Sequence, residues 1–577
     1  MRFLWPSLTW IILTSRFWAA QPTWPSSIDE LEDVMFLGSG YKSRGFSSFV
    51  TPCSYSEHGP GRQAAAEWVQ TAFHDMATTD IFYETKGSVH GGIDASLAFE
   101  LNSGENIGSG LYTSLVTYAR FFNSRLSISD LVALGVYTGV RACGGPAIPM
   151  RGGRIDATLA GPMGVPQPQN GIGQFTNQFM RMGYSKDDMI AMTACGHTLG
   201  GVHSDSFDDI VVPGTVRSDY QLFDGTEEFD NQIATRYING PDINPLSVGV
   251  SKRRKKNSDF QVFSSDNNVT LKAMMNPTTF DAMCISILQR MIETVHPSAM
   301  LSDIIEPYEI KPSGLQLTLL SAGASFEFSG DIRVRTTVRK ASQIGSVQIL
   351  YKDINGFTVR SPIETKQAGK ARGFDDNFTF YSFRTDIPIL TSISSFAVTV
   401  VSTSSGNQVY DNNGKWFPIS DSVRSLITTP VKMTITQKIP RNEGYPTPSP
   451  VPSLVSTSVT MIQEGIMGPY TLYSGSSTIS STVGVKYDVI SGRYSDSFKD
   501  AEDLGDTCEI PDRHPLISNS SSSFSYIYSS DTSTKSKYGS SPVDISVTTA
   551  QPEPRELKPQ HIGLDKLFKP TMSTERT

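Results

Sequence analysis

The spacing of apolar residues changes twice along the chain, and this change limits the fold more than any other feature. From about residue 21 to 300, apolar residues recur three and four positions apart, as on one helix face. From about 305 to 440 they alternate with polar residues, as in half-buried strands. From 441 to 577, Ser, Thr and Pro dominate, leaving too little apolar surface to offset chain entropy. We therefore expect a mostly α-helical domain, a β-sandwich of immunoglobulin-like or fibronectin-like type, and a disordered tail.

Individual segments carry these periods clearly. Helices are expected over 61–76, 111–122, 127–140 and 185–200. Ser185 and Asp188 form a capping-box pattern at the start of the last helix. Strands are expected over 331–338, 346–353, 378–385, 394–403 and 430–437.

The first 20 residues have the layout of a secretory signal peptide, because Arg2 precedes an apolar stretch that ends at Ala19-Ala20. Three N-glycosylation triplets, at Asn268, Asn377 and Asn519, fit a secreted glycoprotein. No later segment has 18 continuous apolar residues, so no membrane span is expected. The net charge of −8 argues against nucleic acid as a partner.

Two histidines lie within expected helices, His74 in "TAFHD" and His197 in "TACGHTLGG". His197 shares an apolar face with Met189 and Thr193, where it is either a hydrogen-bonded core residue or an axial ligand to a large apolar cofactor. The small residues before His197 allow a flat ring to approach the helix. A non-haem metal site formed by His197 and His203 is the weaker interpretation, because side chains six residues apart do not lie on the same face of a helix.

Several motifs occur together in a fixed order between about residues 50 and 300. They are "FHD" (73–75), "GGIDAS" (91–96), "ENIGSGL" (105–111), "CGGPAIPMRGGRID" (143–156), "ACGHTLGG" (194–201) and "VFSSDNNVTL" (262–271). Together they resemble the plant, fungal and bacterial haem peroxidase superfamily, and most closely its secreted fungal, class II-like members. The resemblance implies a helical haem-peroxidase fold over residues 21–300.

The resemblance also implies roles on the peroxide side of a bound haem b. His74 is expected to move a proton between the two oxygens of hydrogen peroxide. Asn106 is expected to hold Nδ1–H of His74, and Phe73 to form a dry wall. Gln70 departs from the family, which places an arginine four residues before this histidine. Since glutamine brings no positive charge, we expect less efficient peroxide activation or lost turnover, unless another cation enters from a loop.

On the opposite face, the resemblance makes His197 the ligand of the haem iron. Asp266 is expected to accept the other ring N–H of His197, and Phe223 to be the proximal aromatic residue.

One or two calcium ions follow from the same resemblance. The expected distal ligands are Asp75, the Gly92 carbonyl, Asp94 and Ser96. The expected proximal ligands are Thr198, Asp224, Thr226 and Asp230, although the spacing from Asp224 to Asp230 is one residue shorter than the family pattern. A solvated acidic loop is the alternative for the distal set.

Five cysteines leave at least one free thiol. The family resemblance favours Cys53–Cys143 as a disulfide, and Cys195–Cys284 is a second pairing that the sequence alone does not settle.

The expected function is a secreted haem peroxidase that uses hydrogen peroxide to oxidise small phenolic or aromatic donors. The alternative, favoured by Gln70, is a haem-binding pseudoperoxidase or a secreted cell-wall-associated binding protein. In either case the β-domain is the expected contact for cell-wall polysaccharide.

Overall fold

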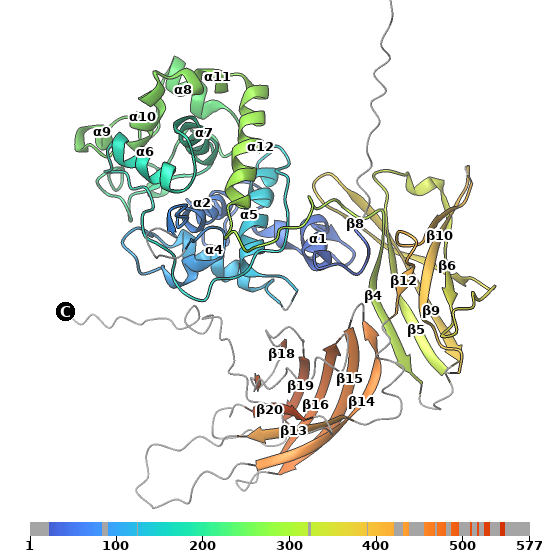
Figure 1. The fold of residues 1–577 in the computed structure, drawn as a ribbon. Helices are drawn as coiled ribbons and strands as arrows, with labels where there is room; N and C mark the ends of the chain where they lie inside the picture. Colours follow the sequence, from blue (N-terminus) through green and yellow to red (C-terminus); the bar gives the residue numbers. More distant parts are fainter. Residues whose placement is uncertain are drawn as a thin grey trace, which may run out of the picture.

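The structure, a computed structural model, contains one helical body and two groups of strands (Figure 1). It describes residues 22–83, 90–123, 125–320, 325–388, 390–404 and 406–419, and the backbone of strands between 431 and 548. The expected signal peptide and the Asn519 triplet lie outside the described residues.

The helical body follows the 3.6-residue period of the first half of the chain. Its helices are α1 (Asp29–Phe36), α2 (Ala64–Met76), α4 (Gly110–Ala119), α5 (Ile128–Ala142), α6 (Ile172–Arg181), α7 (Lys186–His197), α8 (Gln232–Asn239), α9 (Val250–Arg254), α10 (Ser258–Phe263), α11 (Val269–Met274) and α12 (Pro277–Glu293). A short hairpin, β2 (Gly201–His203) with β3 (Tyr220–Leu222), follows α7. The central helix α5 is almost wholly buried and packs against α2.

Local capping decides where two of these helices begin. The Ser127 hydroxyl accepts a hydrogen bond from the Asp130 backbone N–H at 3.0 Å, which starts α5. Ser185 and Asp188 form the expected capping box of α7, with backbone-to-side-chain distances of 2.8 and 3.1 Å. These bonds satisfy N–H groups that a helix start otherwise leaves unpaired.

Two sheets follow the helical body and share one apolar core. The first has the order β1-β8-β9-β5-β4, and the second has the order β11-β10-β6-β7 with β12 paired to β10. Their bounds are β1 (Ser39–Gly40), β4 (Ile310–Leu319), β5 (Ser325–Arg335), β6 (Ile344–Lys352), β7 (Ile363–Glu364), β8 (Lys366–Arg372), β9 (Asn377–Pro388), β10 (Ser395–Ser402), β11 (Gln408–Tyr410) and β12 (Phe417–Pro418). Phe328, Phe383 and Phe396 meet between the sheets. The more specific immunoglobulin-like or fibronectin-like assignment stays a prediction.

Helix α1 joins the helical body to the first sheet (Figure 1). Glu32 and Asp33 on α1 pair with Lys311 of β4 at 2.8 and 3.0 Å, and both also pair with Arg333 of β5. Burial disfavours the Lys311 charge, but the two carboxylates outweigh burial and raise its pKa. Strand β1 makes a second connection, because it pairs with β8 at the edge of this sheet, with Ser39 opposite Arg372. The first sheet is therefore fastened to the helical body.

The end of the chain differs from the expectation. Strands continue beyond residue 430 as an eight-stranded sheet in the order β17-β20-β13-β14-β15-β16-β19-β18. They are β13 (Val431–Gln437), β14 (Val455–Met467), β15 (Tyr470–Ser480), β16 (Lys486–Ser495), β17 (Cys508–Ile510), β18 (Leu516–Ile517), β19 (Phe524–Ser530) and β20 (Val543–Thr548).

Two predictions for this region need correction. β13 pairs with β14 and β20, and so lies in the eight-stranded sheet and not among the strands of residues 305–419. Strand segments also replace part of the tail that we expected to be disordered. The physical reason is their content of Val, Ile, Thr and Tyr, which favour strands even where Ser is frequent. The rest of the expected tail lies outside the described residues. Within the described parts of the chain, no helix is long and apolar enough to cross a bilayer.

Candidate active site

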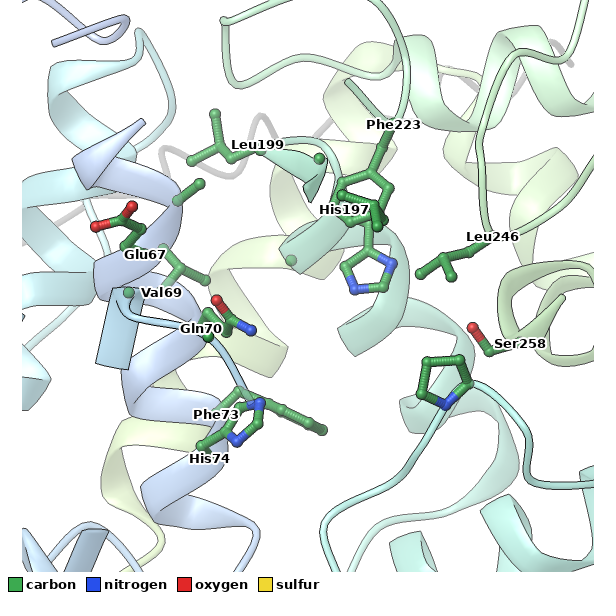
Figure 2. Close-up of a pocket in the computed structure, with 18 of the residues that line it drawn as sticks. Glu67, Val69, Gln70, Phe73, His74, His197, Leu199, Phe223, Leu246 and Ser258 are labelled. Carbon is green, nitrogen blue, oxygen red and sulfur yellow. The ribbon is translucent and has the colours of Figure 1, made fainter. Parts of the chain in front are cut away.

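A cavity of about 350 Å³ lies between α2 and α7 in the helical body. Figure 2 shows Gln70, Phe73 and His74 projecting from α2 on one side, with His197 of α7 and Phe223 on the other. Apolar side chains from α6, α7, α10, α12 and the segment before α9 complete the walls: Phe175, Phe179, Met192, Leu246, Val262 and Met291. The two histidines that the sequence singles out therefore line the same cavity.

His74 is oriented by Asn106. Nδ1 of His74 lies 2.8 Å from Asn106 Oδ1, and the Asn106 amide nitrogen donates to the Glu100 carbonyl at 3.0 Å. Since that second bond fixes which end of the amide is oxygen, Nδ1 of His74 must carry the proton. Nε2 is left as a proton acceptor. Burial lowers the pKa of His74, and the Asn106 bond offsets this only in part.

His197 is oriented by Asp259, not by Asp266 as the sequence interpretation expects. Nδ1 of His197 lies 2.8 Å from Asp259 Oδ2, and the Asp259 side chain is 1% exposed. The Asn244 amide donates to the same oxygen at 2.7 Å, so the carboxylate is held in place. The Phe223 ring stacks on the imidazole at 4.3 Å with an interplanar angle of 12°.

The Asp266 side chain instead bonds to the first turn of α11. Its carboxylate accepts the backbone N–H groups of Val269 and Thr270, at 3.0 and 2.8 Å, at the start of α11. Two Ser-Asp pairs lie seven residues apart. Asp259 is followed at helical spacing by the buried Val262 and Phe263, whereas Asp266 is followed by the exposed Val269 and the buried Thr270. The more apolar pair after Asp259 was the available signal for choosing it.

Gln70 lies on the cavity side of α2, one turn before His74 (Figure 2). Among the described residues that line the cavity, Arg62 is the one Lys or Arg side chain. Its Nε donates to Glu67 at 2.6 Å, and its other nitrogens donate to Ser109 and Thr113, each at 3.0 Å. Arg62 is thus held at the mouth of the cavity and does not replace a cation at position 70.

The expected distal calcium ligands come together around Asp75. The Asp75 carboxylate accepts the backbone N–H groups of Asp94, Ala95 and Leu97 at 2.8–3.2 Å. Burial, and then the nearby Asp94 charge, raise the pKa of Asp75 well above its usual value. Ser96 Oγ is buried and has no partner at full hydrogen-bond geometry, although it lies close to the Asp94 and Glu100 carboxylates. Gly92 lies in the same loop, where a Cβ would approach the Thr294 carbonyl oxygen to 2.8 Å.

The expected proximal ligands form a second group after α7. Thr198 Oγ1 donates to the Asp230 carbonyl oxygen at 2.5 Å, and Thr226 donates to Asp224 Oδ1 at 3.0 Å. Asp224 Oδ2 is buried without a partner. Burial raises the pKa of Asp224 to about 6, with a smaller contribution from Asp230.

Both groups offer oxygen atoms with unmet bonding capacity, which is what a hard cation requires. In the described ranges, no three His, Cys, Asp or Glu side chains form a metal-binding cluster. Calcium would therefore have to bind through hydroxyl and carbonyl oxygens as well as through carboxylates.

The structure contains the expected disulfide and also the second pairing that the sequence left open. Cys53 is joined to Cys143 and Cys195 to Cys284, with Cα–Cα distances of 4.7 and 5.5 Å. The second bond ties α7 to α12 two residues before His197. It therefore restrains the helix that carries the proximal histidine.

Comparison with known proteins agrees with this geometry. Residues 54–281 match the family model described as Peroxidase. A WSC domain-containing protein of Arthroderma benhamiae is 48% identical over 517 residues, which cover 87% of this chain and 70% of that protein. The match to the family model identifies a peroxidase-like domain within residues 54–281, which is less than half of the chain.

Plant relatives match a smaller share of the chain. Peroxisomal L-ascorbate peroxidase 5 of Arabidopsis thaliana is 28% identical over 220 residues, covering 37% of this chain and 73% of that enzyme. Peroxidase 22.3 of Oryza sativa subsp. japonica is 30% identical over 130 residues, covering 20% and 41%. The Arthroderma relative, in contrast, extends along most of the chain, so the two proteins share the β-rich part as well.

Proposed function

We propose that the peroxidase domain binds haem b between His74 and His197 and uses hydrogen peroxide to oxidise small aromatic donors. The observation that carries this proposal is the opposed pair of histidines. Each is held at Nδ1 by its own partner, Asn106 or Asp259, which leaves Nε2 available to the cavity.

The cavity walls fit a flat apolar cofactor. A Cβ added at Gly196, directly before His197, would meet no atom within 4 Å, so the helix leaves open space beside the ligand histidine. The remaining walls are mostly aromatic and aliphatic. Haem bound here would supply the iron at which peroxide is reduced.

The chain's own groups supply proton transfer and orientation. His74 Nε2 takes a proton from hydrogen peroxide and returns it to the departing oxygen. The lowered pKa of His74 keeps the ring neutral, and therefore able to accept that proton, at neutral pH. Asp259 polarises His197 and makes it a stronger electron donor to iron. Phe73 keeps water away from the proton-transfer site.

Gln70 makes peroxide activation slow in this proposal. Among the described residues that line the cavity, Arg62 is the one positive side chain, and its bond to Glu67 keeps it from stabilising charge that develops as the O–O bond breaks. The same observation favours the second candidate, a haem-binding pseudoperoxidase or a wall-associated binding protein. Turnover with hydrogen peroxide separates the two.

Calcium is part of the proposal at both oxygen-rich groups. A cation would offset the paired charges of Asp75 and Asp94, and it would give the Ser96 hydroxyl a partner. At the second group it would bind the unpaired oxygen of Asp224. Because Asp75 follows His74 directly, calcium would also steady the distal histidine.

We further propose that the protein is secreted, with residues 1–20 as its signal peptide, and is glycosylated. The exposed Asn377 side chain on β9 is a suitable acceptor. Contact between the β-rich part and cell-wall polysaccharide belongs to the same proposal. The relative named for a WSC domain shares this part of the chain, although that name alone assigns no ligand here.

The test is to load the mature chain with haemin and to compare it with His197→Ala. The wild type should give a Soret band and oxidise guaiacol only when hydrogen peroxide is present, and His197→Ala should lose the iron-ligand signature. A Soret band that does not depend on His197 would contradict the assignment of the ligand. A His197-dependent band without guaiacol oxidation would favour the pseudoperoxidase.

A further inference from the structure

The mouth of the cavity is formed by two loops that face each other. Glu105, Ile107 and Gly108 come from the loop before α4, and Asp205 and Ser206 come from the segment after β2. A Cβ added at Gly108 would lie 3.6 Å from the Ser206 hydroxyl oxygen, which shows how closely the loops approach. Any donor that enters by this route passes between them.

Two carboxylates at this mouth have no ion-pair partner among the described residues. Four carboxylates line the cavity, but Glu67 is paired with Arg62 and the buried Asp259 with His197. The remaining two are Glu105 and Asp205.

Neither of these two carboxylates forms an ion pair with a Lys or Arg side chain among the described residues, although the charge of Arg181 acts on Glu105 from farther away. Glu105 Oε2 accepts backbone N–H groups of Gly164 and Val165 at 2.8 and 3.2 Å, and these neutral donors do not cancel its charge. Asp205 is exposed and accepts the Ser206 hydroxyl at 3.0 Å. His203 does not compensate either, because burial lowers its pKa and favours the neutral ring.

We propose that Asp205 and Glu105 make the mouth select aromatic donors by charge, favouring those with a cationic side chain and disfavouring anionic ones. This inference rests on the proposed peroxidase function and names its donor class. Ile107, 44% exposed, offers an apolar contact for the ring of such a donor. A cleft lined by one sign of charge concentrates ligands of the opposite sign.

Three phenols with nearly the same ring test the inference: tyramine is cationic, p-cresol is neutral and 4-hydroxyphenylacetate is anionic. We expect kcat/KM of the haem-loaded chain to fall in that order at low salt. The ratio between tyramine and 4-hydroxyphenylacetate should shrink as salt increases, since the screening length falls from about 10 Å at 0.1 M to about 3 Å at 1 M.

Asp205→Asn should lower that ratio about fivefold. One negative charge about 8 Å from the donor's charge in water attracts the cationic donor and repels the anionic one, and the two effects together give this factor. Asp187→Asn, an exposed carboxylate at the start of α7, removes the same charge away from the mouth and should leave the ratio unchanged. Dissociation constants of the cation and the anion for the resting protein, measured without peroxide, should show the same preference.

Equal rates and equal binding for the three phenols, or a ratio that Asp187→Asn changes as much as Asp205→Asn, would overturn charge selection. Failure to oxidise any phenol would instead overturn the proposed peroxidase function. In that case the two dissociation constants still decide the charge preference, because they require no turnover.

Discussion

Replacing Asp259 with asparagine tests the proximal arrangement most directly. The substitution keeps the side-chain size but removes a negative charge 2.8 Å from His197 Nδ1. Water does not replace that charge, because the Asp259 side chain is 1% exposed. A hydrogen bond to a charged group contributes about 1.5–3 kcal/mol. If the Asp259 charge stabilises Fe(III) over Fe(II) by this amount, its removal should raise the Fe(III)/Fe(II) potential by about 65–130 mV, at 59 mV per tenfold change for a one-electron couple.

Spectroelectrochemical titration of the haem-loaded protein measures this shift. Asp266→Asn is the matched control, since Asp266 bonds to Val269 and Thr270 of its own segment and should leave the potential unchanged. Asp266→Asn should lower only the stability of α11. An unchanged potential in Asp259→Asn, or a larger shift in Asp266→Asn, would refute the assignment of Asp259.

Three further predictions concern the distal side, the calcium groups and α1. Gln70→Arg should accelerate the reaction with hydrogen peroxide by about 10² or more, as followed by stopped-flow at the Soret band. Gln174→Arg, at an exposed position on α6, should have no effect on this rate. A wild type that already reacts fast would contradict the prediction. Because the folded-state pKa of Asp224 is raised to about 6, its protonated form stabilises the calcium-free fold at low pH, and this contribution is lost as pH rises through 6. Without calcium, the free energy of unfolding, measured by heat or urea, should fall by up to about 3 kcal/mol between pH 4 and 6.5. Saturating calcium or Asp224→Asn should remove that loss. The same pH profile for the calcium-free wild type, the calcium-saturated wild type and Asp224→Asn would argue against the site. Glu32→Gln leaves Arg333 and Lys311 short of a carboxylate in a buried cluster and should lower the free energy of unfolding by about 3–5 kcal/mol. Glu57→Gln, whose partner Arg120 is 46% exposed, should cost less than about 1 kcal/mol, and equal losses in the two variants would contradict the role of the cluster.

The sequence alone was enough for features that depend on neighbours a few residues apart. Capping by Ser185, and the α2 segment that carries His74, follow from hydrogen bonds and apolar spacing within one or two helical turns. The order of short motifs was likewise sufficient to expect the peroxidase domain that the family comparison found. Such features act locally, so they are readable without knowing where the rest of the chain lies.

Only the tertiary structure decided which distant groups meet. His197 lies 62 residues before Asp259, and nothing local favours that carboxylate over Asp266 apart from the helix face it occupies. Likewise, β1 pairs with β8 more than 300 residues later, and Arg62 meets Ser109 and Thr113 across the mouth. The physical reason is that the contact partners of a side chain depend on how whole helices and sheets pack. A strand's alternating pattern specifies its two faces, but not the neighbour to which its backbone will bond.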